Sequence, residues 1–100
     1  MKPLAGKIAI VTGAGRGIGR AIALLLSQSG ARVVLASRSE SELSAVGEEI
    51  TKQNGEALVA STDLTRDEEM KRLINRTLEH WGSVDYLINN AGWGSTAPVI

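Results

Sequence analysis

The chain has 100 residues, which is enough for one small domain and too few for two. Eleven basic residues balance eleven acidic ones, so the net charge favours neither nucleic acid nor an anionic membrane as a partner. The absence of cysteine excludes disulfides, thiolate metal sites and a thiol nucleophile. No apolar run is long enough to span a membrane, and we expect a cytoplasmic protein.

The first half of the chain alternates between strand and helix patterns. Residues 7–12 (KIAIVT) form a continuous apolar run that is typical of a buried strand. A helix is expected over residues 18–29, where Ser29-Gly30 supplies a stop. Its apolar side chains recur at helical spacing: Ile18, Ile22, Leu25 and Leu26. Residues 32–37 (RVVLAS) predict a second strand.

The next segments continue this alternation. Ser39 and Glu42 have the spacing of a capping box, which predicts the start of a second helix. One face of that helix is apolar, with Leu43, Val46 and Ile50. Residues 56–62 predict a third strand that is more polar than the first two, as suits the edge of a sheet.

A second capping-box pair, Thr65 and Glu68, predicts the start of a third helix, which Gly82 ends. The apolar stripe of this helix consists of Met70, Leu73, Ile74, Thr77, Leu78 and Trp81. Residues 84–90 (VDYLINN) predict a fourth strand, in which Asp85 caps the entry and Tyr86 packs. Strands and helices that alternate at this pitch predict βαβ units around a parallel sheet.

Four glycines follow the first strand: Gly13, Gly15, Gly17 and Gly19. Their spacing does not fit G-x-G-x-x-G but fits T-G-x-x-x-G-x-G, which begins at Thr12. A glycine-rich turn that leads into a helix presents backbone N–H groups to an anion. Gly13 would allow the tight turn, Gly17 the close approach of a pyrophosphate, and Gly19 close packing of helix on sheet. A purely structural turn is the alternative.

The end of the second strand bears on the choice of dinucleotide. A domain that selects NAD usually has Asp or Glu there, to hold the ribose 2′-hydroxyl. Ser37 and Arg38 stand at this place, and Arg16 lies within the glycine loop. Two guanidiniums at one place suit the extra 2′-phosphate, so we expect NADP. In the alternative interpretation both arginines are solvated surface side chains.

Three motifs occur in order: TGAGRGIG from Thr12, STDLT around Asp63, and NNAG at residues 89–92. Together they resemble the short-chain dehydrogenase/reductase family, classical type, and most closely its 3-oxoacyl-acyl-carrier-protein reductases. The resemblance implies an α/β fold with a Rossmann-type doubly wound parallel sheet, whose N-terminal part has the strand order 3-2-1-4. The first and fourth strands would then flank one crevice.

The resemblance also implies the cofactor contacts. Thr12 would be tied to the NNAG segment, and the glycine loop would lie under the pyrophosphate. Asp63 and the backbone of Leu64 would hold the adenine, and Asn90 with its Ala-Gly neighbours would border the ribose on the nicotinamide side. Asp63 as the mere start of a turn is the alternative. The expected cofactor-binding residues are Thr12, Gly13, Gly15, Arg16, Gly17, Ile18, Gly19, Arg38, Asp63, Leu64, Asn90, Ala91 and Gly92.

We assign no catalytic residue and no metal ligand in this chain. The family's chemistry depends on a Ser, a Tyr and a Lys four residues after the Tyr. The one tyrosine is Tyr86, and position 90 is Asn rather than Lys. We expect a structural role for Asn89 and loop packing for Trp93, and a favourable helix-dipole contact explains His80.

We therefore expect residues 1–100 to be the N-terminal, NADP-binding portion of a single Rossmann domain, inactive alone because the catalytic C-terminal portion is not in the chain. Within the fourth strand the run YLI (residues 86–88) is apolar on both faces and has no charge or proline to protect it as an edge, so something should pair with it and cover it. The whole protein would be an NADP-dependent oxidoreductase that reduces a small-molecule or acyl-carrier-bound carbonyl, as a dimer or tetramer. A non-catalytic dinucleotide-binding module or sensor is the alternative.

Overall fold

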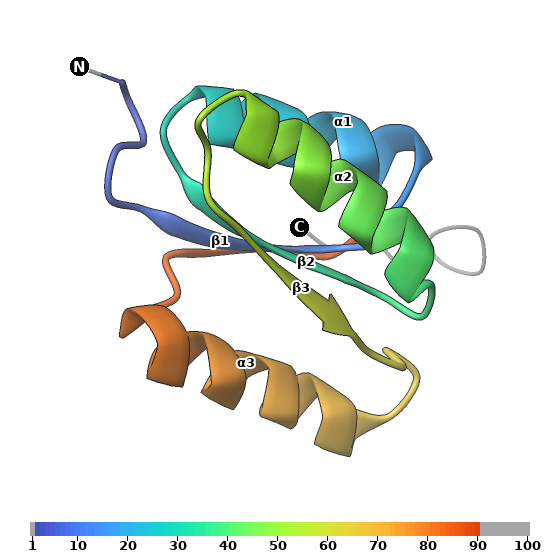
Figure 1. Ribbon diagram of the computed structural model, residues 1–100. Coiled ribbons are helices and arrows are strands. Elements are labelled where there is room, and N and C mark those ends of the chain that lie inside the picture. Colours follow the sequence, from blue (N-terminus) through green and yellow to red (C-terminus); the bar gives the residue numbers. More distant parts are fainter. Residues whose placement is uncertain (1, 91–100) are drawn as a thin grey trace.

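The computed structural model describes residues 2–90, which form a parallel sheet with helices on both faces (Figure 1). In chain order the elements are β1 (Ile8–Thr12), α1 (Gly17–Gln28), β2 (Arg32–Ser37), α2 (Glu40–Lys52), β3 (Ala57–Ser61), α3 (Asp67–Trp81) and β4 (Tyr86–Ile88). The strand order is β3-β2-β1-β4, and the strand pairs are parallel. Both the doubly wound α/β class and the 3-2-1-4 order are confirmed.

The core has two halves, one on each face of the sheet. Helices α1 and α2 cover one face, and α3 covers the other (Figure 1). Alternate residues of the central strands pack in one half of the core or the other, because successive side chains of a strand point to opposite faces of the sheet. Val11 and Leu35 pack on the side of α1 and α2, whereas Ile10 and Val34 pack on the side of α3. The continuous apolar run of β1 is therefore buried along its whole length, as predicted.

The buried face of helix α1 matches the predicted one only in part, since Ile22 and Leu26 pack against the core. Its buried residues are Gly19, Ala23 and Ser27, whereas Ile18 and Leu25 are 57% and 63% exposed. The helix lies so close to the end of β1 that a Cβ on Gly19 would stand 2.0 Å from the carbonyl oxygen of Gly13. At such short range only small side chains fit between helix and sheet, so hydrophobicity alone did not indicate which residues of α1 lie nearest the sheet.

The two predicted capping boxes have different outcomes. The Ser39 hydroxyl accepts a bond from the Glu42 N–H and caps α2, as predicted. The prediction for Thr65 is wrong, since α3 begins at Asp67 and its N-cap, Arg66, makes no side-chain capping bond. Thr65 instead donates its N–H and its hydroxyl to Asp63 Oδ1, at 3.0 and 2.6 Å. A turn closed by an Asp side chain has displaced the cap here.

Strand β4 is shorter than the predicted segment 84–90 and pairs with β1. Asp85 fixes its start, because the Ile8 N–H donates to Asp85 Oδ2 and the Asp85 N–H donates to the Ile8 carbonyl, both at 2.8 Å. Tyr86 and Leu87 are 41% and 43% exposed, so the expectation that Tyr86 packs is wrong within residues 2–90. No helix in this range is both long and apolar enough to cross a bilayer.

Candidate functional site

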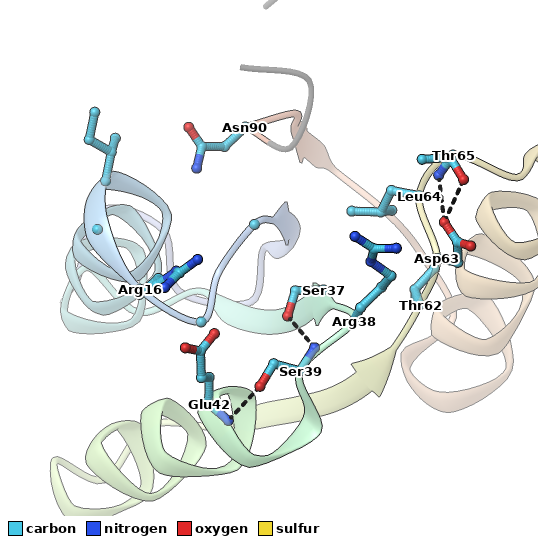
Figure 2. Close-up of a pocket in the computed structure, with 14 residues that line it drawn as sticks. Arg16, Ser37, Arg38, Ser39, Glu42, Thr62, Asp63, Leu64, Thr65 and Asn90 are labelled. Carbon is cyan, nitrogen blue, oxygen red and sulfur yellow. Dashed lines mark hydrogen bonds between the residues drawn. The ribbon is translucent and has the colours of Figure 1, made fainter. Parts of the chain in front are cut away.

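A groove of about 620 Å³ opens at the carboxyl ends of the strands. The glycine loop after β1, the residues after β2, the turn after β3 and Asn90 after β4 all line it (Figure 2). The chain leaves β1 toward α1 on one face, and α3 on the other face precedes β4. The groove therefore lies at the point where the direction of winding changes, which is the usual ligand site in such sheets.

Most of the predicted cofactor-binding residues come together at this groove. Those that line it are Gly13, Gly15, Arg16, Gly17, Ile18, Arg38, Asp63, Leu64 and Asn90. Thr12 and Gly19 are buried beside them and are not part of the lining. Ala91, Gly92 and Trp93 lie outside the described residues.

The glycine loop is shaped to leave room over the start of α1. Gly13 and Gly17 have φ values of 64° and 61°, in the left-handed region that favours glycine. A Cβ on Gly17 would meet no atom within 4 Å, so this position faces open space rather than packed protein. The absence of a side chain at Gly17 thus keeps the groove open where a ligand would approach.

The N-terminus of α1 differs from those of α2 and α3. Helix α2 has a Ser39 cap and two acids in its first turn, and α3 has three acids there. Helix α1 has no side-chain capping bond at Arg16 and no acid in its first turn. No acidic residue in the first turn of α1 therefore compensates the positive end of the helix dipole, which leaves this end suited to a bound anion.

Two arginines flank the groove on the side of β2. Arg16, from the glycine loop, and Arg38, directly after β2, lie on opposite sides with Ser37 between them (Figure 2). The ion pairs found in residues 2–90 are Arg20–Glu49 and Arg32–Glu56, and neither uses these two guanidiniums. Both arginines are exposed, so they are accessible to a phosphate in the groove.

Asp63 brings a fixed negative charge to the other end of the groove. Bonds from the Thr65 hydroxyl and N–H lower the pKa of Asp63 below its usual value, and the charges of Arg38 and Arg66 lower it further. Its N–H is also occupied, since it donates to Glu69 Oε1 at 2.7 Å. Asp63 thus shapes the turn, as the structural alternative held, and also lines the groove, as the functional interpretation requires.

A buried hydroxyl ties the two central strand ends together. Thr12 Oγ1 accepts a bond from the Asn90 N–H at 2.8 Å. It also lies 3.3 Å from the carbonyl oxygen of Ile88 and 3.1 Å from Asn89 Oδ1, either of which can accept its proton. The predicted link from Thr12 to the NNAG segment is confirmed as far as Asn90, and Asn89 has the structural role expected of it.

Five residues that were not among the expected cofactor-binding residues also line the groove: Ser37, Ser39, Glu42, Thr62 and Thr65. Of these, only Ser37 had been placed near the ribose. Ser39 and Glu42 were interpreted as helix caps only, and Thr65 likewise. Three of them could have been found from their neighbours in the sequence, because Ser37 and Ser39 flank Arg38 and Thr62 precedes Asp63.

No group of three or more His, Asp or Glu side chains in the described part of the chain is arranged to hold a metal ion. The ring of His80, in the last turn of α3, packs edge-on against Trp81, and their centroids are 5.0 Å apart. Trp81 in turn packs on the core beside α3, as predicted. These aromatic residues therefore contribute to packing and not to the groove.

The sequence profile of the short chain dehydrogenase family matches residues 7–100. The chain belongs to this family. An uncharacterized oxidoreductase of Listeria monocytogenes is 42% identical over 93 residues, which are 93% of this chain and 38% of the relative. A hydroxynaphthalene reductase-like protein of Metarhizium anisopliae is 42% identical over 92 residues, 91% of this chain and 34% of the relative. The chain thus spans less than two fifths of the length of these relatives.

Solved structures of the family have the same fold. A metagenomic short-chain oxidoreductase in complex with NADP superposes with a TM-score of 0.87 at 45% identity, covering 91% of this chain and 41% of that one. A hydroxysteroid dehydrogenase from Escherichia coli superposes with a TM-score of 0.88 at 39% identity, covering 95% of this chain and 40% of that one.

The Thr12 hydroxyl can be tested by removing it without changing the size of the side chain. Thr12→Val should lower the free energy of unfolding by about 1–3 kcal/mol, because the N–H of the half-buried Asn90 loses its acceptor. Thr12→Ser keeps the hydroxyl and should retain most of that bond. Denaturant titration of both variants measures the difference. Equal losses for valine and serine would show that the methyl group, and not the hydroxyl, stabilises the strand ends.

Proposed function

We propose that this chain is the NADP-binding portion of an oxidoreductase that reduces a carbonyl group to an alcohol. The observation that carries the proposal is the groove itself. It joins an open glycine loop, a helix N-terminus without a side-chain cap, and two arginines that form no ion pair within residues 2–90. Each of these features favours an anionic ligand, and together they suit a phosphorylated dinucleotide.

The residues present fit such a cofactor along its length. The loop around Gly17 suits the pyrophosphate, since backbone and helix end are both open there. Arg16 and Arg38 suit the 2′-phosphate, and no carboxylate occurs between residues 31 and 39 to hold a free 2′-hydroxyl. Asp63 and Leu64 suit the adenine, and Asn90 suits the nicotinamide side. A volume of about 620 Å³ is adequate for a ligand of this size.

The proposal gives this chain cofactor binding and no catalytic residue. When bound, NADPH supplies the hydride for the reduction. A proton donor of the Tyr-x-x-x-Lys kind is not found here, because Asn90 stands four residues after Tyr86. We propose that residues beyond this segment supply the donor, that residues 1–100 alone are inactive, and that the whole protein is a cytoplasmic homo-oligomer.

The substrate of the whole protein is proposed as a carbonyl compound, and a 3-oxoacyl group on an acyl carrier is the candidate that the sequence resemblance supplies. The relatives described above include a hydroxynaphthalene reductase-like protein and a hydroxysteroid dehydrogenase, so a cyclic carbonyl compound is the second candidate. Assays of the intact protein with NADPH and one carbonyl of each class would decide between them. Cofactor binding without turnover of any carbonyl would favour a non-catalytic sensor.

Cofactor binding at the glycine loop can be tested at Gly17. Gly17→Val should abolish measurable NADPH binding, because a branched side chain would fill the open space above α1. Titration calorimetry of the intact protein gives the affinity. Unchanged affinity would exclude the loop as the phosphate site.

A matched control separates this effect from backbone strain. Gly82, at the end of α3, also has a positive φ, 85°, and open space around its Cβ position. Gly82→Val therefore carries a comparable conformational penalty far from the groove. It should lower stability and leave the NADPH affinity of the folded protein unchanged.

Cofactor choice can be tested at Arg38. Charge-assisted hydrogen bonds contribute about 1.5–3 kcal/mol each. Arg38→Asp should therefore lower the affinity for NADPH by about one to two orders of magnitude. NADH affinity should stay the same or improve, because the new carboxylate can accept a bond from a free 2′-hydroxyl. The preference of the unmodified protein for NADPH should shrink as salt is added, since both arginines are exposed.

Arg76→Asp makes the same charge change on the exposed surface of α3, outside the groove. It should leave the ratio of NADPH to NADH affinity unchanged. If the unmodified protein binds NADH as tightly as NADPH at low salt, Arg38 is a solvated surface residue and the proposal of NADP is wrong.

A further inference from the structure

Glu42 is an acidic side chain in the groove, near the end where Arg16 and Arg38 would favour an anion. It is the third residue of α2 and lines the groove with Gly15, Arg16 and Ser39. A carboxylate at this place would repel a phosphate that arrives between the two arginines. Its presence therefore needs an explanation beyond capping a helix.

Capping does not occupy the carboxylate. In a full capping box, the side chain of Glu42 would accept a bond from the Ser39 N–H. That N–H donates instead to Ser37 Oγ, at 3.2 Å. The bond from Glu42 to Ser39 Oγ uses the backbone N–H of Glu42, at 3.4 Å. Within residues 2–90 the Glu42 carboxylate has neither a hydrogen-bond donor nor an ion-pair partner.

The side chain extends across to the glycine loop. A Cβ on Gly15 would stand 2.9 Å from Glu42 Cβ and 3.0 Å from Glu42 Oε1, so the two residues are in direct contact. Figure 2 shows the carboxylate directed toward the loop that carries Arg16, on the Ser37 and Ser39 side of the groove. The negative charge is thereby held next to the place proposed for the cofactor's 2′-phosphate.

We propose that Glu42 is a cofactor-specificity determinant whose carboxylate opposes a phosphate on the adenosine ribose and so offsets part of the NADP preference set by Arg16 and Arg38. This inference rests on the proposed function, because it assumes that a dinucleotide binds in the groove. Two effects act in the same direction. The carboxylate repels the phosphate, and it offers Arg16 a competing anionic partner.

The test compares two substitutions that remove the same charge from the same helix turn. Glu42→Gln should raise the ratio of NADPH to NADH affinity about three- to tenfold, the range expected for a partly exposed charge acting on a dianion. Glu40→Gln removes the other acid of the first turn of α2, which does not line the groove, and should leave the ratio unchanged. Calorimetric titration of the intact protein with each cofactor gives both affinities.

If Glu42 has only a structural role, Glu42→Gln would lower the affinities for NADPH and NADH equally and leave their ratio unchanged. This result would overturn the inference. An equal rise for Glu40→Gln would overturn it too, since the effect would then come from overall charge. Glu42→Ala should move the ratio in the same direction as Glu42→Gln, and added salt should reduce both changes. If the unmodified protein binds neither cofactor, the proposed function fails, and this outcome is distinct from a ratio that does not move.

Discussion

The buried hydroxyl of Thr12 joins the ends of β1 and β4, and the groove depends on that junction. Thr12 is fully buried and bonds to the Asn90 N–H, so the segment after β4 starts from a fixed point beside the glycine loop. At the other end of these strands, Asp85 and Ile8 exchange two bonds. A short strand of three residues is thus held at both ends, and this register places Asn90 opposite the N-terminus of α1.

Close packing on the other side of β1 completes the constraint. Gly19 lets α1 approach the Gly13 carbonyl, at a distance that no other residue would permit. The start of α1 is consequently directed at the groove, with no acid or side-chain cap of its own. The charges of Arg16, Arg38 and Glu42 then differentiate one end of the groove from the other. In the proposed function, the fold provides the site for the cofactor's phosphates, and these three side chains adjust the preference between NADPH and NADH.

The sequence allowed the sheet, its order and most of the groove to be predicted, because each depends on local patterns. Apolar runs mark the buried strands, and glycines mark the turn after β1. The sequence predictions were wrong where a side chain could contact either of two local partners. Thr65 bonds to Asp63 instead of capping α3, and α1 turns its small residues rather than Leu25 to the sheet. Which partner a side chain contacts depends on interatomic distances, and these cannot be derived from the spacing of apolar residues in the sequence. Glu42 is a case of the same kind, since the Ser39 N–H donates to Ser37 Oγ and the Glu42 side chain, which does not accept it, lines the groove.

We propose that a dinucleotide lies along the carboxyl ends of the strands, in the order that these residues imply. Chemical-shift mapping of the isotope-labelled intact protein during titration with NADPH tests this most directly. We expect the perturbed amides to fall in three stretches, residues 13–19, 37–39 and 62–65, which are far apart in sequence and adjacent in the groove. Perturbations that avoid these stretches, or that gather on the exposed side of α3, would contradict it.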